Sequence, residues 1–197
     1  MNKPDYKKIT QVLNYIATKE GGKINYMKAL KLLYLSERLH LREYGRLITD
    51  DNLIAMKNGT LGSQAKDIAT MSEYLPHVVY EYVKNKLISK EYTIEAKSQS
   101  INELSDTDIE CIDKILAVFG KKTQYELAEL THDLPEWKKH QYDIENEATH
   151  VVILNVLDLF KSTHNKVLEK IYSQTSAELD LSRDLFSESL EHKSQLA

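Results

Sequence analysis

Apolar side chains along most of this chain recur every three to four residues, the spacing that places them on one face of an α-helix. Polar capping residues precede several of these stretches, and glycine or proline follows them. The pairs Ser105 with Asp108 and Thr123 with Glu126 are the clearest capping signals. The pattern predicts helices over residues 5–19, 25–44, 63–74, 77–90, 105–119, 124–131, 135–137 and 151–160.

Two regions break the helical pattern. Residues 46–49 and 53–57 are short apolar segments around a turn at residues 50–52, and residues 92–96 alternate between polar and apolar side chains. These segments are predicted to be short strands. The chain has only 3 prolines and 6 glycines, too few turn formers for an all-β sandwich. We therefore predict a mainly α fold (α+β) with a small β element near residues 46–57 and 92–96.

The character of the chain changes near residue 143. Residues 151–160 are densely apolar and are predicted to form a buried helix. After residue 173 the chain is acidic with interspersed leucines, and such a tail can pack on the domain, dock into a groove of a partner or stay disordered. We predict one domain over residues 1–142 and a C-terminal helical extension over residues 143–197, packed on the domain or on a partner.

Charge is unevenly distributed, although the net charge is only −4. The first 60 residues carry 11 Lys and Arg against 6 Asp and Glu, and the remainder carries 15 against 24. The lysines of the basic part, Lys31 among them, are predicted to lie on helix surfaces. The acidic remainder would repel the phosphates of a nucleic acid. A charge-complementary protein is therefore the expected partner, and DNA binding is not expected.

The sequence contains no recognisable catalytic or metal-binding motif. None of its 7 histidines belongs to an HExxH pair, and the single cysteine, Cys111, excludes a multi-cysteine zinc site. There is no nucleophile elbow, phosphate-binding glycine loop or dinucleotide fingerprint. His132-Asp133 has the composition of a catalytic pair, but no nucleophile stands at a known spacing, so a structural histidine is predicted. We predict no enzyme activity, no cofactor and no metal.

The surface composition favours protein recognition inside the cell. The chain has 12 tyrosines against 3 phenylalanines, and tyrosine suits half-buried and interface positions. The N-terminus lacks an apolar signal core, and no apolar run is long enough for a membrane span. A cytoplasmic protein with no membrane partner is therefore expected.

Two blocks of the sequence carry a pattern larger than any single element. The first contains Lys31-Leu32-Leu33-Tyr34, His40, Tyr44-Gly45-Arg46, Ile48-Thr49 and Ala55-Met56-Lys57-Asn58-Gly59. The second contains Leu104-Ser105, Asp108-Ile109-Glu110, Thr131-His132-Asp133 and Trp137. In this order and spacing, the blocks resemble the Panacea antitoxin domain family (SocA-like, once called phage-associated protein). The resemblance covers roughly residues 5–140.

The resemblance implies a mostly helical antitoxin that neutralises a co-encoded cognate toxin by direct protein–protein binding, whatever the chemistry of that toxin. Some members are thought to deliver the toxin to a protease, so an adaptor of a AAA+ protease stays open as an alternative. A DNA-binding transcriptional regulator from a mobile genetic element is the other. The candidate partner-binding residues are Lys31, Tyr34, His40, Tyr44, Arg46, Asp50, Met56, Asn58, His132, Trp137, Leu185 and Phe186.

One position departs from the family pattern. Members usually have proline directly after the Asn-Gly step, where this chain has Thr60. Proline fixes φ in advance, so its absence predicts a looser turn at residues 58–60.

Overall fold

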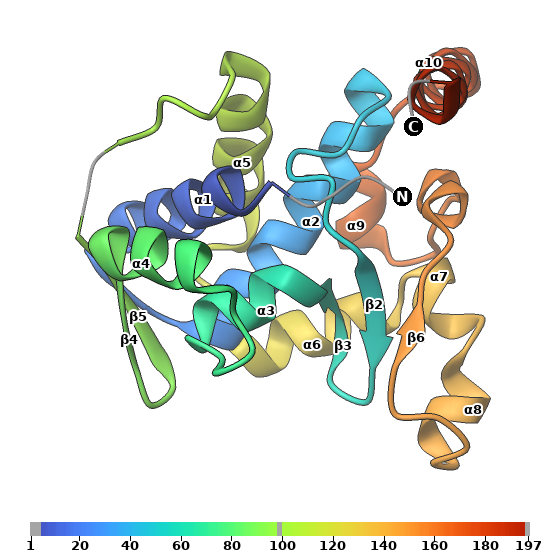
Figure 1. Cartoon of the computed structure of the whole chain (residues 1–197). Helices are drawn as coiled ribbons and strands as arrows, with labels where there is room; N and C mark the ends of the chain where they lie inside the picture. The colour runs from blue at the N-terminus through green and yellow to red at the C-terminus, as the bar shows by residue number, and fades with distance from the viewer. Residues whose placement is uncertain (1–4, 98–99, 196–197) are drawn as a thin grey trace.

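The computed structural model describes residues 5–97 and 100–195. Its helices are α1 (Tyr6–Lys19), α2 (Tyr26–Tyr44), α3 (Ser63–Ala69), α4 (His77–Lys86), α5 (Asp106–Phe119), α6 (Gln124–His132), α7 (Pro135–Lys138), α8 (Gln141–Glu145), η1 (Val156–Phe160, a 3-10 helix), α9 (Lys166–Ile171) and α10 (Ser176–Gln195). Its strands are β1 (Lys23–Asn25), β2 (Leu53–Met56), β3 (Gly59–Gly62), β4 (Leu87–Lys90), β5 (Thr93–Ala96) and β6 (Val152–Ile153). The predicted mainly α fold with a small β part is confirmed (Figure 1).

Helix α2 is the centre of the fold, with α1, α5, α6 and α10 packed around it. Asn25 caps its first turn by accepting a hydrogen bond from the Lys28 N–H at 3.2 Å, as predicted. Gly45 ends the helix with a φ of 65°, a left-handed conformation that glycine adopts without strain. Residues 29–42 are all buried. The charged side chains of α2 must therefore find their partners inside the protein.

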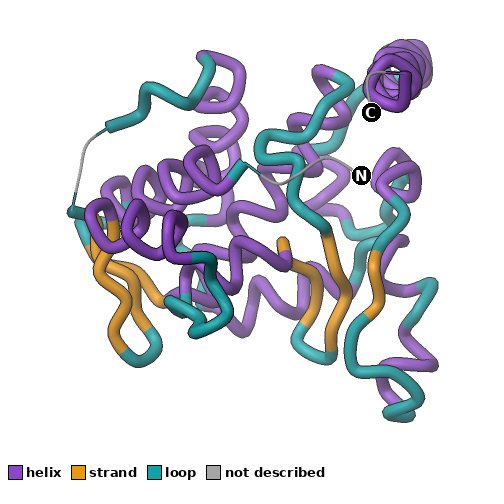
Figure 2. Tube along the Cα trace, in the orientation of Figure 1, coloured by secondary structure: helices purple, strands orange, loops and turns teal. Residues whose placement is uncertain are grey.

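In the described part of the chain, two separate three-stranded antiparallel sheets flank the helices (Figure 2). One has the strand order β1-β5-β4, and the other has the order β3-β2-β6. In the second sheet, Ala55 pairs with Thr60 on one side and with Val152 on the other. This sheet therefore brings the segment after residue 150 beside a hairpin from the first third of the chain.

Residues 46–49 form a loop, so the strand predicted there is wrong. The carboxylate of Glu37, on α2, accepts hydrogen bonds from the Ile48 N–H at 2.6 Å and the Thr49 N–H at 3.0 Å. The Thr49 hydroxyl donates to the same carboxylate. A side chain thus satisfies backbone donors that a neighbouring strand would otherwise pair with.

Two predicted helices end early. The helix expected over residues 77–90 stops at Lys86, and Leu87–Lys90 instead form strand β4, which pairs with β5. The helix expected over residues 63–74 stops at Ala69. Residues 87–90 form a strand because they pair with β5, a later segment. The spacing of apolar residues within residues 77–90 does not reveal this pairing.

Residues 151–160 do not form the predicted buried helix. Val152 and Ile153 pair with β2 as strand β6. Asn155 then accepts a hydrogen bond from the Leu157 N–H at 3.0 Å, which starts the 3-10 helix η1. The free edge of β2 offers backbone partners that an isolated apolar run cannot reveal. Within the described residues, no helix has the length and apolar character needed to cross a bilayer.

The C-terminal segment packs back on α2. Arg38 and Arg42, one turn apart on α2, reach into it: Arg38 Nη2 donates to the Lys161 carbonyl at 2.6 Å, and Arg42 Nη1 donates to the Phe160 carbonyl at 2.5 Å. Both guanidinium groups lie over the Tyr172 ring, at 4.4 and 5.7 Å from its centroid. Helix α10 then packs against both α2 and η1.

Candidate functional site

The β2–β3 hairpin is held near its tip by side chains from two helices. Trp137 Nε1, from α7, donates to the Met56 carbonyl at 2.9 Å. Lys31 Nζ, from α2, donates to the Thr60 carbonyl at 2.8 Å. Each bond satisfies a carbonyl on one strand of the hairpin, so the hairpin is positioned from both sides.

Gly59 lets the hairpin approach α6 closely. Its φ is 87°, and a Cβ at this position would lie 2.1 Å from Thr131 Oγ1. Thr60, which stands where the family pattern has proline, pairs with Ala55 inside strand β3. The turn at residues 58–60 thus joins the two paired strands of a hairpin, and the Lys31 bond to the Thr60 carbonyl adds a further contact there.

Lys31 is fully buried, so the prediction that it lies on a helix surface is wrong. Its side chain points toward the hairpin, and an ammonium group in such a place is disfavoured relative to the neutral amine. Burial accordingly lowers the pKa of Lys31 to about 7.

A buried three-residue cluster joins α2 to α7. Glu136 Oε1 accepts hydrogen bonds from the Tyr34 hydroxyl at 2.9 Å and from Arg38 Nε at 3.0 Å. All three side chains are fully buried. Loss of one partner would leave an uncompensated charge in the interior, so this cluster fixes the position of α7 and of Trp137 within it.

A second cluster surrounds the buried carboxylate of Asp108 at the start of α5. Lys8 Nζ lies 2.7 Å from one carboxylate oxygen, and Arg46 Nη2 lies 3.1 Å from the other. His40 Nδ1 lies 2.8 Å from the Arg46 carbonyl, so this nitrogen carries the proton and Nε2 can accept from the Thr107 hydroxyl at 3.1 Å. Burial lowers the pKa of His40 to about 4. A neutral His40 therefore links α2 to Thr107 in α5, and the Lys8–Asp108 ion pair links α1 to the same helix.

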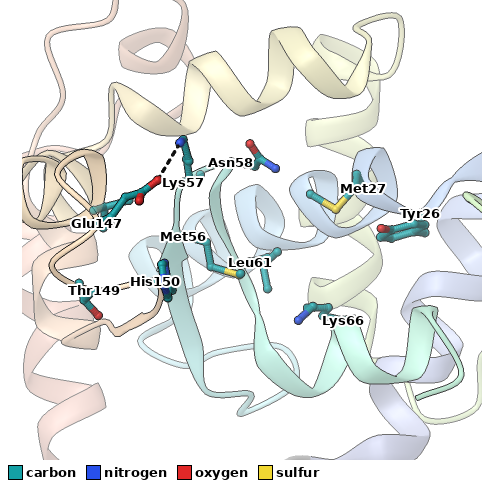
Figure 3. A pocket seen from close by; sticks show the side chains of 12 residues that line it. Tyr26, Met27, Met56, Lys57, Asn58, Leu61, Lys66, Glu147, Thr149 and His150 are labelled. Carbon is teal, nitrogen blue, oxygen red and sulfur yellow. Dashed lines mark ion pairs between the residues drawn. The ribbon is translucent and has the colours of Figure 1, made fainter. Parts of the chain in front are cut away.

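A pocket of about 310 Å³ lies beside the hairpin tip (Figure 3). Its apolar side chains come from α2, the hairpin and α8, and they are Met27, Met56, Leu61 and Ile144. The rest of the lining consists of Tyr26, Lys57, Asn58, Gly59, Lys66, Glu147, Thr149 and His150. Lys57 and Glu147 form an ion pair at 3.6 Å on one side.

A second hollow, of about 320 Å³, lies between the β6–η1 segment and α10; we call it the C-terminal groove. Three of its apolar side chains face solvent, with exposed fractions of 67% for Ile153, 42% for Leu157 and 47% for Leu190. Phe186 also lines it but is buried. Helix α10 comes close to α2 here because Gly45 has no side chain: a Cβ there would lie 2.6 Å from the Ser182 carbonyl oxygen.

The model of one protein family, described as antitoxin SocA-like, Panacea domain, matches residues 30–138. These residues make up more than half of the chain. The chain belongs to this family. No curated protein and no solved structure matches this chain. The matched Panacea residues include the β2–β3 hairpin and the residues of α2 that contact Glu136 and Asp108. One wall of the pocket and most of the C-terminal groove come from residues after 138.

The candidate partner-binding residues divide into an internal and an external group. The candidate partner-binding residues buried inside are Lys31, Tyr34, His40, Trp137 and Phe186. Those with exposed or partly exposed side chains are Tyr44, Arg46, Asp50, Met56, Asn58, His132 and Leu185. The internal residues hold the hairpin and the helices in place, and only the external ones can touch a partner directly.

His132 and Asp133 do not form a catalytic pair. The His132 ring stacks on the Trp137 ring with their centroids 4.0 Å apart. The Asp133 carboxylate instead accepts from the Asn165 side-chain amide at 2.8 Å and pairs with Lys138 at 3.0 Å. The structure thus agrees with a structural histidine at this junction. Within the described residues, no cluster of His, Cys, Asp and Glu has the makeup of a metal site.

Sequence reasoning did not single out Arg38, Arg42 or Glu136, although they connect α2 to α7 and to the C-terminal segment. A usable signal was present in α2. Residues 29–35 are apolar except for Lys31, so this helix has no polar face to turn toward solvent. Charged residues on such a helix are internal, and each then requires an internal partner.

Proposed function

We propose that this Panacea-domain protein is an antitoxin that neutralises a co-encoded toxin in the cytoplasm by binding it directly. Family membership supports the antitoxin role. The hydrogen bonds and ion pairs around Glu136 and Asp108 are directed at other parts of the fold, so these clusters serve the scaffold that carries the binding surface. The proposal includes no catalytic step and no cofactor.

The observation that carries the binding proposal is the exposed apolar lining of the C-terminal groove. Ile153, Leu157 and Leu190 lie around one hollow and are each at least 42% exposed. Leu181 and Leu185, which lie on α10 with Leu190, have exposed fractions of 63% and 47%. A contiguous apolar patch of this kind marks an interaction surface, whereas scattered exposed apolar residues do not.

The charge around the groove defines the chemistry of the partner. Helix α10 carries five carboxylates against one arginine and one lysine. Asp50, which is partly exposed, also lines the groove. We therefore propose that the toxin presents an apolar segment flanked by Lys or Arg residues, because opposite charges at the rim steer association and exclude wrong partners.

The DNA-binding alternative finds no support in α6, the helix that would be the second of a helix-turn-helix. Its exposed side chains include Tyr125, Glu126 and Glu129. A surface with two carboxylates and no cation is poorly suited to contact phosphates.

Co-expression tests the proposal. The product of the adjacent gene is expressed alone and together with this protein, and cell survival is recorded. We expect toxicity alone, survival on co-expression and one co-eluting complex on gel filtration. Absence of both rescue and complex would overturn the proposal.

A control separates binding at the groove from a general surface effect. Val118 on α5 is 47% exposed, the same fraction as Leu190, but lies outside the groove. We expect Leu190→Glu to reduce rescue and Val118→Glu to leave it intact, with both variants folded by circular dichroism.

A further inference from the structure

We propose that the pocket beside the hairpin tip is a socket for one apolar side chain of the toxin with a carboxylate next to it. The inference rests on the proposed function for the identity of the partner. Its chemistry comes from the lining of the pocket, which is separate from the C-terminal groove.

The base of the pocket is built for an apolar side chain. Met27 and Met56 lie on the two sides of Leu61 (Figure 3), and Ile144 of α8 also lines the pocket. Methionine side chains are flexible and polarisable, so they adapt to the shape of an inserted group. A volume of about 310 Å³ is at the small end for ligand pockets and suits a single large side chain. Such buried anchors supply much of the affinity of protein interfaces.

The rim selects an anion. The lining carries Lys57 and Lys66 against the single carboxylate of Glu147, and it also includes His150, on a chain whose net charge is −4. Lys66 takes part in no ion pair within the described part of the chain. The Lys57–Glu147 pair is long, at 3.6 Å, and both side chains are about 70% exposed, so it contributes little and can open. A carboxylate beside the inserted side chain would gain Lys66 as a new partner.

The pocket is held in shape before any partner arrives. The Trp137 bond to the Met56 carbonyl and the Lys31 bond to the Thr60 carbonyl fix the hairpin that supplies one wall. The opposite wall comes from residues 144–150, which lie outside the matched family residues. Preorganisation of this kind reduces the entropy lost on binding.

Methionine methyl NMR tests the socket without the toxin. Of the 4 methionines, Met27 and Met56 line the pocket and Met71 does not, so Met71 serves as an internal control. The probes are N-acetyl-L-leucine, its uncharged amide and acetate. We expect saturable shifts at Met27 and Met56 with N-acetyl-L-leucine, at least fivefold weaker binding of the amide, and no shift with acetate. Equal binding of acid and amide, or no shift at either methyl, would overturn the inference.

Charge reversal connects the socket to the toxin. We expect Lys66→Glu to weaken binding of both N-acetyl-L-leucine and the toxin by about tenfold. Lys84→Glu, the same change on the exposed surface of α4 and outside the pocket, should leave both unchanged. Wild-type toxin affinity in Lys66→Glu would overturn the socket while the proposed function stands. Methyl shifts in a wild-type protein that forms no toxin complex would overturn the proposed function, and with it the assignment of the socket to the toxin.

Discussion

Helices α2 and α10 lie side by side and place their side chains in opposite ways. In α2, Lys31, Glu37 and Arg38 are buried. In α10, Leu181 and Leu190 are exposed. Both helices thus depart from the rule that charged residues face water and apolar residues face the core.

The two departures have different physical meanings. A buried charge is tolerated only where fixed partners receive it, so it specifies how the elements of the fold meet. An exposed leucine has no such partner within the chain, and burying it against another protein releases water at a gain of about 25 cal/mol per Å². The charges of α2 therefore define the architecture, and we propose that the leucines of α10 form a surface for association.

The strongest prediction breaks the buried pair on the α2 side of this comparison. Glu136→Leu leaves the Arg38 guanidinium without its carboxylate, so we expect the free energy of unfolding to fall by about 3–5 kcal/mol. The double variant Arg38→Met with Glu136→Leu removes both charges and should be more stable than the single one. Urea unfolding gives the free energy of unfolding of the wild type, the single variant and the double variant. A loss below about 1 kcal/mol in the single variant would show that the pair does not specify the fold.

A glycine comparison measures the close approach of the hairpin to α6. Gly59→Ala introduces a Cβ 2.1 Å from Thr131 Oγ1 at a φ of 87°, and we expect a loss of about 3–4 kcal/mol. Gly21 has a similar φ of 91° but nothing within 4 Å of an added Cβ. Gly21→Ala should therefore lose only about 1–2 kcal/mol. Equal losses in thermal unfolding would mean that the contact with Thr131 does not matter.

The buried lysine predicts a specific pH dependence. The pKa of Lys31 falls from its usual 10.5 to about 7 on folding, so the unfolded chain binds more protons than the folded chain between these values. Stability should therefore rise with pH from 7 to 9.5, by up to about 3 kcal/mol from this group. In Lys31→Met this part of the rise should be absent, which denaturant unfolding at several pH values can measure. If stability rose with pH equally in the wild type and in Lys31→Met, the Lys31 ammonium would have to be solvated in the folded protein.

The smallest expected effect on stability is on the α10 side. Leu190→Glu changes a side chain that is 47% exposed, so we expect the free energy of unfolding to change by no more than about 0.5 kcal/mol. Chemical denaturation checks this directly. A loss above about 2 kcal/mol would mean that Leu190 belongs to the core.

Local signals predicted the helices that begin with a capping side chain. Asn25, Ser105 and Thr123 each accept a hydrogen bond from their own first turn, so the information lies within four residues. The strand β4 and the segment 151–160 were predicted wrongly because their structure depends on partners far along the chain. Strand pairing is non-local, and an apolar run alone does not reveal it.

The candidate site was predicted only in part, for a related reason. The residues around Asn58 and Met56 lie at the pocket, but Lys31, Tyr34 and Trp137 are internal. From the sequence alone, a polar residue that contacts a partner protein cannot be told from one that contacts a buried carboxylate. Only the three-dimensional fold, which places Glu136 beside Tyr34, distinguishes the two.

The affinity of the purified protein for the product of the adjacent gene, measured by calorimetry, tests the central claim most directly. The double variant Ile153→Glu with Leu190→Glu removes the apolar character of the C-terminal groove, and Val118→Glu is the matched control. We predict a loss of affinity of about 100-fold or more in the double variant and wild-type affinity in the control, with both proteins folded. Wild-type affinity in the double variant would contradict the account.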